Sequence, residues 1–276
     1  MNRRAFVKTI GSGAVAVWSG SHLLGARVKS VGLQLYTIRA EMEKDFEGSL
    51  ARVAQIGYRE VEFAGYFGRT PQQVKAILKK NGLKTPSAHI GLDLFEKDLP
   101  KTIETAKILG QKYLICPSLP EPRRKTIDDW KKLAELFNRL GTESKKSGLD
   151  FAYHNHAFEF QPLDGQLPYD VLLQNTDRKL VKMEMDLYWV VRADQDPVKY
   201  FQKYPGRFAL VHVKDMDTTP QRGFAEVGRG NMDFKKIFSA SKQAGIKHYI
   251  VEQDSTPGNP FDSIKISLDY LSKFQY

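Results

Sequence analysis

Val181-Lys-Met-Glu-Met-Asp186 is a short apolar run that ends on a side chain able to bind metal, and three other runs share its form. They are Asp150-Phe-Ala-Tyr-His154, Ala209-Leu-Val-His212 and His248-Tyr-Ile-Val-Glu252. Each run is rich in β-branched and aromatic residues and is followed by a polar loop and a helical pattern. This order predicts a β-strand followed by an α-helix. The last residue of each run is therefore expected at the carboxyl end of a strand.

The alternation of apolar runs and amphipathic segments extends along the whole chain from residue 28. Strands are expected at residues 31–36, 60–63, 85–89, 113–116, 150–154, 181–186, 209–213 and 249–252. Helices are expected at residues 46–56, 71–81, 100–109, 127–147, 169–174, 197–204, 234–244 and 261–273. Several of these helices end on Gly or Asn, which is typical of helix C-termini. Eight such units predict an α/β fold, a single closed (β/α)8 barrel.

An open, doubly wound sheet is the alternative fold for alternating strands and helices. It usually carries a glycine-rich phosphate-binding turn after its first strand, and the segment Tyr36-Thr-Ile-Arg-Ala-Glu-Met contains no glycine. The glycine pair Gly228-Arg-Gly230 follows the seventh expected strand and indicates a mobile loop over the barrel mouth. The closed barrel is therefore favoured.

Strand ends converge at the carboxyl face of a closed parallel barrel, where active sites are built. His154, Asp186, His212 and Glu252 would meet there. Two imidazoles and two carboxylates suit Mn²⁺, Zn²⁺, Co²⁺ or Fe²⁺ better than Ca²⁺ or Mg²⁺. The sequence therefore predicts a site for one divalent transition metal, without choosing among these four.

The net charge of +10 raises the question of a nucleic-acid partner. Three of the positive charges, Arg3, Arg4 and Lys8, lie at the amino terminus, and the others are spread over the expected helices. No basic stripe with interleaved aromatic residues is present. No nucleic-acid partner is therefore expected.

The amino terminus resembles a bacterial twin-arginine export signal. Asn2-Arg-Arg-Ala-Phe-Val-Lys8 is followed by uncharged residues 9–26, rich in Gly, Ala, Val and Ser. A membrane-spanning helix is the alternative, but the stretch is short, mildly apolar and interrupted by glycines. We expect a signal at residues 1–26, a barrel domain at residues 27–276, and a periplasmic or other extracytoplasmic protein without stable membrane insertion once the signal is removed. Phosphorylated sugars are scarce in that location.

A series of short phrases makes the chain, from about residue 30 to 274, resemble the xylose isomerase-like TIM barrels, the sugar phosphate isomerase/epimerase family. These phrases are Gly32-Leu-Gln-Leu-Tyr-Thr-Ile-Arg39, Gly57-Tyr-Arg-Glu-Val-Glu62, Ser87-Ala-His89, Tyr153-His-Asn-His156, Met185-Asp-Leu-Tyr-Trp189, His212-Val-Lys-Asp215, Gly228-Arg-Gly-Asn-Met-Asp233 and Val251-Glu252. The resemblance implies a TIM barrel that acts on a small carbohydrate. Barrels of this kind often pair, so a homodimer is an expectation.

In epimerases of this family, a Glu, an Asp, a His and a Glu at the ends of strands five to eight hold one metal, and the two Glu residues exchange protons with the substrate. Asp186, His212 and Glu252 match the last three positions. The chain departs from the pattern at strand five, where His154 takes the Glu position. Glu159, in the following loop, is the only nearby acidic substitute. Glu184 shares the face of Asp186 but should lie deeper, as a buried polar partner.

Several other side chains are expected near the mouth. His156 and His89 are suited to bind substrate hydroxyls or to move a proton. Lys214 shares the face of His212 and could contact a substrate oxygen. Trp189 and Tyr36 are suited to stack on the C–H face of a sugar.

The expected chemistry is deprotonation beside a carbonyl polarised by the metal. We expect first a metal-dependent isomerase or epimerase that acts on a non-phosphorylated sugar through an enediolate, with Glu252 and His154, Glu159 or His156 moving protons. A lyase or dehydratase, such as a 3-keto-glycoside lyase or an inosose dehydratase-like enzyme, is the alternative. A non-catalytic sugar-binding barrel is a third. A phosphodiesterase of the endonuclease IV type would need more ligands for its zinc cluster than these strand ends provide.

Overall fold

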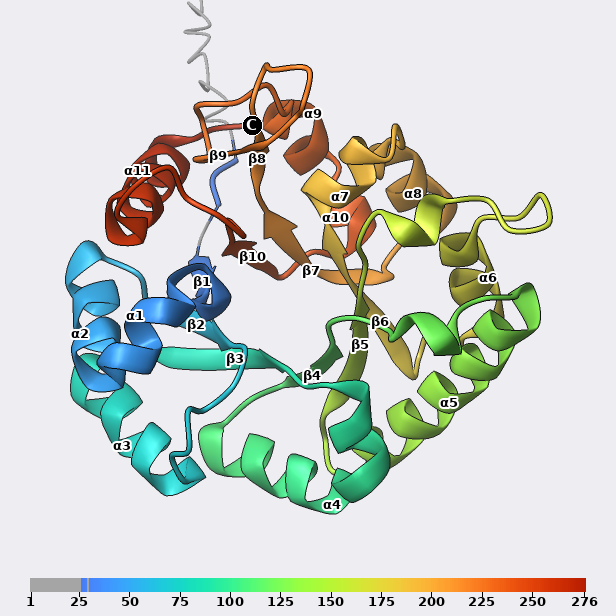
Figure 1. Ribbon diagram of the computed structural model, residues 1–276, viewed down its shortest axis with the longest axis horizontal. Coiled ribbons are helices and arrows are strands. Elements are labelled where there is room, and N and C mark those ends of the chain that lie inside the picture. The colour runs from blue at the N-terminus through green and yellow to red at the C-terminus, as the bar shows by residue number, and fades with distance from the viewer. Residues whose placement is uncertain (1–25, 29) are drawn as a thin grey trace, which may run out of the picture.

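Eight parallel strands close into a barrel in the order β1, β10, β7, β6, β5, β4, β3, β2. They are β1 (Val31–Gln34), β2 (Glu60–Phe63), β3 (Lys84–His89), β4 (Tyr113–Cys116), β5 (Asp150–His154), β6 (Val181–Asp186), β7 (Phe208–Val213) and β10 (His248–Val251). Figure 1 shows the strands as a ring at the centre of the molecule with the helices outside it. The predicted (β/α)8 fold is confirmed.

The computed structural model describes residues 26–28 and 30–276. Apart from Ala26, the predicted export signal lies outside the described residues. Within the described part of the chain, no helix is both long enough and apolar enough to span a membrane.

The helices that surround the barrel mostly match the predicted segments. They are α1 (Arg39–Lys44), α2 (Phe46–Ile56), α3 (Pro71–Asn81), α4 (Leu92–Leu109), α5 (Ile127–Lys146), α6 (Pro168–Asn175), α7 (Leu187–Arg192), α8 (Pro197–Lys203), α9 (Phe234–Ser239), α10 (Ser241–Ala244) and α11 (Pro260–Lys273). Thr70 and Thr126 each form a capping box at a helix start, and Gly82, Gly110 and Gly245 end helices in the left-handed conformation that glycine adopts without strain. Local capping therefore defines the βα units that the sequence pattern predicts.

The first strand is shorter than predicted. It ends at Gln34, whose side-chain oxygen accepts a hydrogen bond from the Tyr36 amide at 3.1 Å and starts the 3-10 helix η1 (Leu35–Ile38). Tyr36 therefore lies past the strand end, on the mouth side. The short helices α1 and α7, which follow β1 and β6, were not predicted.

Two predicted helices also differ from the structure. The helix expected from residue 100 begins at Leu92 and kinks at Asp98, whose carboxylate caps the second half by accepting from the Lys101 amide at 3.0 Å. The helix expected at residues 234–244 is divided into α9 and α10 at Ala240. At the eighth strand, β10 stops at Val251, so Glu252 is the first residue beyond it.

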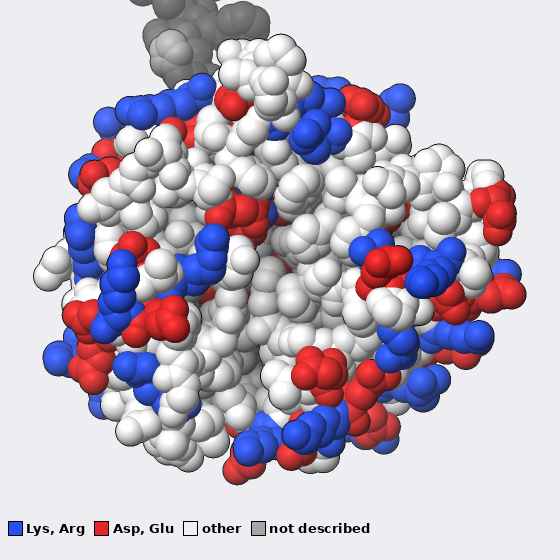
Figure 2. All heavy atoms as spheres, in the orientation of Figure 1, with Lys and Arg blue, Asp and Glu red and all other residues white. Residues whose placement is uncertain are grey.

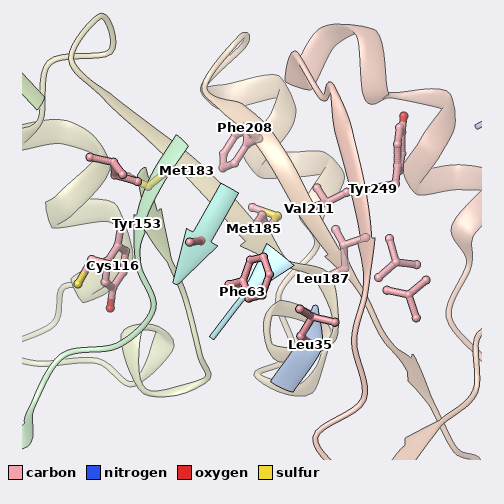
Figure 3. Close-up of a cluster of buried hydrophobic side chains, with 14 of the residues drawn as sticks. Leu35, Phe63, Cys116, Tyr153, Met183, Met185, Leu187, Phe208, Val211 and Tyr249 are labelled. Atoms are coloured by element: carbon pink, nitrogen blue, oxygen red, sulfur yellow. The ribbon is translucent and has the colours of Figure 1, made fainter. Parts of the chain in front are cut away.

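The strands carry different side chains on their two faces, because successive residues alternate. A large outer core joins the strands to the helices, and Figure 3 shows part of it, including Phe63, Met183 and Val211. A smaller, separate cluster is made by Tyr113, Ile115, Ala152, Ala209, Leu210 and Ile250. In β5, for example, Phe151 and Tyr153 belong to the outer core, whereas Ala152 belongs to the smaller cluster and shares its face with His154. The strand-end residue His154 therefore lies next to an apolar cluster on the same face of its strand.

The loop expected to move over the mouth is anchored instead. The buried carboxylate of Asp215, in the short strand β8 (Asp215–Met216), accepts hydrogen bonds from the amides of Gly228 at 2.9 Å and Gly230 at 3.0 Å. The Met232 amide donates to the same carboxylate at 3.1 Å. Strand β8 also pairs with β9 (Phe224–Ala225). These bonds hold residues 226–233 next to the end of β7.

Candidate metal centre and active-site cavity

A cavity of about 330 Å³ opens at the carboxyl ends of the strands. Its lining residues are Tyr36, Ala64, His89, Pro117, Ser118, His154, His156, Lys214, Glu252 and Asp254. Figure 2 shows a hollow near the middle of this face with acidic side chains beside it, while Lys and Arg lie mostly toward the outer edge. On this face, negative rather than positive charge therefore borders the hollow.

The four residues predicted to hold a metal are close together in the structure. His154, Asp186, His212 and Glu252 are all buried, and each has a ligand atom within 4.8 Å of those of the other three. A second group, His89, His154, Glu184 and His212, has its ligand atoms equally close together, with His89 partly exposed and the other three buried. We call the first the outer group and the second the inner group; the two histidines His154 and His212 belong to both.

Glu184 is the centre of the inner group. Its Oε2 lies 2.7 Å from His89 Nε2, 3.0 Å from His154 Nδ1 and 3.3 Å from His212 Nε2. The other oxygen, Oε1, is buried without a hydrogen-bond partner among the described residues. Glu184 is a buried polar partner, as predicted, but it contacts three imidazoles at once.

Glu62, at the end of β2, is a site residue to which the sequence analysis gave no role. Its Oε1 lies 2.9 Å from His212 Nε2 and 3.1 Å from His89 Nε2, and it accepts a hydrogen bond from Gln34 Nε2 at 2.7 Å. The Ser87 hydroxyl donates to its other oxygen. The phrase that ends at Glu62 follows the same pattern of an apolar run with a terminal ligand, and this signal could have identified it.

The ammonium group of Lys214 lies between the two carboxylates of the outer group. Its Nζ lies 2.9 Å from Asp186 Oδ2, 2.7 Å from Glu252 Oε2 and 2.8 Å from Asp254 Oδ2, and the side chain is 1% exposed. Glu252 Oε2 also lies 2.7 Å from His212 Nδ1. Asp254, which the sequence analysis did not identify, completes this arrangement of one ammonium group and three carboxylates.

The protonation states follow from these contacts. Burial, together with His212 and His89, holds the pKa of His154 well below its usual value, so His154 is neutral. Although burial lowers it, Glu62 and Glu184 raise the pKa of His89 to about 9. Although burial opposes this as well, Asp186 and Glu252 raise the pKa of Lys214, which is therefore protonated. The carboxylates thus create a field that stabilises positive charge, and a divalent cation would benefit from the same field.

The residues fit a divalent transition-metal ion. Imidazole nitrogens and carboxylate oxygens are the ligands that such ions prefer, and Glu184 Oε1 is a buried acceptor without a partner. The fit does not depend on Glu159, the alternative fourth ligand, which belongs to neither group. Its carboxylate accepts from the Tyr153 hydroxyl at 2.5 Å and from the His156 amide at 2.9 Å. Burial raises the pKa of Glu159 to about 7.

Four of the five residues predicted to contact the substrate line the cavity. Tyr36, His89, His156 and Lys214 all line the cavity, and Tyr36 is 41% exposed there. Trp189 does not line it but packs beside His156, at a ring separation of 5.8 Å. His156 stacks on Phe158, and burial and Lys214 lower its pKa to about 4. Its Nδ1 is buried without a hydrogen-bond partner in the described structure, so a neutral imidazole is available beside the cavity.

A closed parallel barrel with a polar cavity at the carboxyl ends of its strands has the architecture of a barrel enzyme. Comparison with known proteins specifies the family: the chain belongs to the xylose isomerase-like TIM barrels, whose family model matches residues 50–274. The resemblance inferred from the sequence phrases is confirmed at this level.

Two relatives cover most of the chain. The inosose dehydratase of Lacticaseibacillus casei is 25% identical in an alignment of 269 positions that covers 83% of this chain and 89% of the relative. The crystal structure of a sugar phosphate isomerase/epimerase from Parabacteroides distasonis is 31% identical, with a TM-score of 0.75 over 90% of this chain and 95% of that one. The structure of an L-ribulose 3-epimerase, at 17% identity and a TM-score of 0.65 over 87% of this chain and 92% of that one, shares the fold.

Proposed function

We propose that this protein is a metal-dependent enzyme that removes the proton beside the carbonyl of an uncharged keto-sugar or cyclitol and then eliminates a β-substituent, as a dehydratase or lyase does. The observation that carries this proposal is the position of His154. At this position the epimerases that the chain resembles have a proton-exchanging Glu. His154 lines the cavity, but it is only 2% exposed and its two ring nitrogens face the carboxylates of Glu184 and Asp186. It is therefore poorly placed to exchange a proton with a substrate.

An elimination needs one base and one acid, and the cavity has both. His156 lines the cavity and is neutral, so its imidazole can accept the proton from carbon. Lys214 is protonated and can donate to the leaving oxygen. The C–H bond breaks, a C=C bond forms, and the C–O bond breaks to release water or an alcohol. A bound metal would polarise the carbonyl and stabilise the developing negative charge.

The lining of the cavity favours an uncharged substrate. Among the described residues, Lys214 is the only Lys or Arg that lines the cavity, and its ammonium group already faces three carboxylates. A phosphate group would meet the negative charge of Glu252 and Asp254 without a free cation. The volume of about 330 Å³ lies at the small end of ligand cavities and suits a single sugar ring.

The comparisons support a sugar-modifying enzyme of this superfamily. Several relatives are named inosose dehydratases, and a dehydration is an elimination of the proposed kind. The isomerase/epimerase from Parabacteroides distasonis supports the second candidate, an isomerase or epimerase. That candidate is also favoured by the presence of both His156 and Glu252 at the cavity, because two groups could then exchange protons with the substrate.

The test is to incubate the metal-loaded protein in D₂O with a panel of uncharged keto-sugars, 3-keto-glycosides and inososes, and to follow products by NMR and mass spectrometry. Loss of water or of an alcohol supports the proposal. A deuterated stereoisomer or isomer of unchanged connectivity would support the second candidate instead. Metal-bound protein that binds these compounds but leaves them unchanged would indicate a sugar-binding barrel.

Substitution of His156 tests the assignment of the base. His156→Gln should lower turnover by about 10²–10⁴-fold, the usual range for loss of a general base, with metal content unchanged. Ser118→Ala, which alters another side chain that lines the cavity, is the matched control. Equal activity of the His156→Gln variant and its parent would exclude His156 as the base.

We also propose that residues 1–26 direct export, which would place the enzyme in the periplasm with non-phosphorylated substrates. The support is the Arg3-Arg4 pair and the uncharged stretch that follows it. Replacing both arginines by lysine should leave the protein in the cytoplasm of a bacterial host with this pathway. Export that continues without the arginine pair would contradict the proposal.

A further inference from the structure

Lys214, the acid of the proposed elimination, lies at the inner end of a line of side chains that leads out of the cavity. Its Nζ lies 2.8 Å from Asp254 Oδ2. Asp254 follows Gln253, whose amide donates to Thr37 Oγ1 at 3.0 Å, and Thr37 follows Tyr36. Lys214, Asp254 and Tyr36 all line the same cavity. The acid and Tyr36 therefore lie on the side of the mouth formed by β7, β10 and β1, which are neighbours in the barrel.

The exposure of these side chains increases from the acid outward. Lys214 is 1% exposed, Asp254 is 27% exposed and Tyr36 is 41% exposed. The leaving oxygen of a substrate must approach Lys214 Nζ to take its proton, so a group attached to that oxygen has a path to solvent past Asp254 and Tyr36. A water molecule as leaving group would need no such path. The open side next to the acid therefore leaves room for a leaving group larger than water.

Tyr36 has the geometry of a stacking surface at the outer end of this path. It is the only Phe, Tyr or Trp among the described residues that line the cavity. The Arg39 guanidinium carbon lies 4.1 Å from the centre of the Tyr36 ring, and Arg39 Nη1 donates to the Tyr36 carbonyl oxygen at 2.8 Å. Arg39 therefore covers one face of the aromatic ring and helps to fix it. The uncovered face is available to a flat apolar surface, such as another aromatic ring or the C–H face of a sugar.

The large apolar side chains that are exposed in the described structure are concentrated on the same face of the barrel. They are Tyr36, Phe67, Leu94 and Tyr270. The first three follow β1, β2 and β3, so they lie on the carboxyl side where the cavity opens, whereas Tyr270 lies in α11. The cavity of about 330 Å³ suits one sugar ring, and exposed apolar surface outside it suits a part of the substrate that extends beyond that ring.

We propose that the substrate is a glycoside whose leaving group is an alcohol that carries a ring, and that this ring stacks on Tyr36 while the sugar occupies the cavity. The proposal rests on the elimination in the proposed function. The glycosidic alcohol can leave only if the anomeric carbon is β to the carbonyl, which places the carbonyl at C3 of the sugar. His156 takes the proton from C2, the C1=C2 bond forms, the C1–O bond breaks, and the alcohol oxygen takes a proton from Lys214.

Matched substrates test the role of Tyr36. Benzyl and methyl 3-keto-glucosides release alcohols that differ mainly by a ring, and a 3-keto-disaccharide releases a second sugar. In the metal-loaded parent, kcat/KM should be about 10-fold higher for a ring-bearing leaving group than for methanol, the upper end of what a stacked ring pair contributes. A preference for the benzyl compound would identify the ring as aromatic, and a preference for the disaccharide alone would identify it as a sugar.

Variants at Tyr36 should change this ratio of kcat/KM values. Tyr36→Leu keeps an apolar side chain but removes the flat ring, so it should abolish the preference, and Tyr36→Phe should retain it. Tyr270→Ala, which removes an exposed tyrosine outside the cavity, is the matched control and should keep the ratio of the parent. Tyr36 is exposed, so its variants should fold, which circular dichroism checks.

The same ratio in the parent and in Tyr36→Leu would overturn the proposal. A parent that dehydrates inososes but eliminates from none of the glycosides would also overturn it and leave the proposed function standing. Elimination from neither class would contradict the proposed function instead. Calorimetric binding of benzyl and methyl glucosides then decides the role of Tyr36 without turnover: tighter binding of the benzyl compound that Tyr36→Leu abolishes supports it, and equal binding overturns it.

Discussion

His154 is the last residue of β5 and Glu159 lies five residues further on, and the sequence analysis offered either as the fourth metal ligand. The fold places them in different surroundings: His154 contacts Glu184 in the inner group, whereas Glu159 contacts the Tyr153 hydroxyl and the His156 amide. Glu159 therefore supports the loop that carries His156. A single imidazole at the strand end, in place of a carboxylate, is what moves the proposed chemistry from epimerisation toward elimination.

Glu159 should make stability depend on pH. Burial raises its pKa from 4.5 to about 7, so between these values the folded protein keeps a proton that the unfolded chain has lost. The stabilisation is complete below the unfolded pKa and is lost as pH rises through 7. Between pH 4.5 and 8 this group should lower the free energy of unfolding by up to about 3 kcal/mol. Urea denaturation of the parent and of Glu159→Gln over this range measures the difference.

The control for this series is Glu143→Gln, at an exposed glutamate on α5. As pH rises, Glu159→Gln should become more stable relative to the parent. The difference in the free energy of unfolding between Glu143→Gln and the parent should stay constant. If the free energies of unfolding of all three proteins change with pH in parallel, the pKa of Glu159 is not raised in the folded state.

At the level of the elements, α5 packs against the β5–β6 side of the barrel through Gly141. A Cβ at this position would lie 2.5 Å from the Leu180 carbonyl oxygen and 2.9 Å from its carbon. Alanine usually stabilises a helix interior relative to glycine by about 1 kcal/mol. Here Gly141→Ala should instead cost about 1–3 kcal/mol, because the backbone just before β6 would have to shift.

Chemical denaturation measures this change, and Thr142→Ala provides the comparison on the exposed face of the same helix. The substitution at residue 142 should leave stability nearly unchanged or raise it slightly. A Gly141→Ala variant as stable as the parent would show that α5 can move away from Leu180 at little cost.

The second element-level feature is the anchored segment at residues 226–233. Asn offers one acceptor oxygen where Asp215 offers two, so Asp215→Asn should leave the Gly228 and Gly230 amides, or the Met232 amide, without an acceptor. Bonds to a charged group contribute about 1.5–3 kcal/mol each, and we expect a loss of about 3 kcal/mol in the free energy of unfolding. Hydrogen exchange should accelerate at the amides that lose their acceptor.

Asp217→Asn is the matched substitution two residues further along the same hairpin. Its carboxylate accepts from the Thr219 amide rather than from the anchored segment. Exchange at Gly228 and Gly230 should therefore stay slow in this variant. If both substitutions accelerate exchange equally, the anchoring by Asp215 is not what holds the segment.

At the scale of the whole molecule, a bound ion would tie together several strands of the ring. Its ligands in either group come from several strands, so metal should bind the folded state and not the unfolded chain. At 100 times its dissociation constant, such a ligand stabilises by about 2.7 kcal/mol. A chelator should therefore lower the melting temperature of the metal-loaded parent. It should not change the melting temperature of His212→Ala, because this variant lacks a ligand that belongs to both groups. An equal effect of chelator on both proteins would contradict this.

The barrel itself could be predicted from the sequence because the signals that define it are local. Alternating runs such as residues 150–154 and 181–186, together with helix ends at Gly82 and Gly110, are read from neighbouring residues, and their observed bounds agree closely with the prediction. The errors occurred where a side chain turns the backbone, as Gln34 does after β1 and Asp98 does within α4. Such hydrogen bonds leave no periodic pattern.

The sequence by itself therefore determined the fold and the positions of strand-end ligands, since both depend on short-range order along the chain. Only the tertiary structure decided which of these residues meet. Glu62 and His89 lie far from Glu184 and His212 in sequence, and closure of the ring brings them within about 3 Å. It also decided that Lys214 faces Asp186, Glu252 and Asp254. Contacts across a closed barrel depend on register and ring orientation, and a pattern of residue types along the chain carries neither.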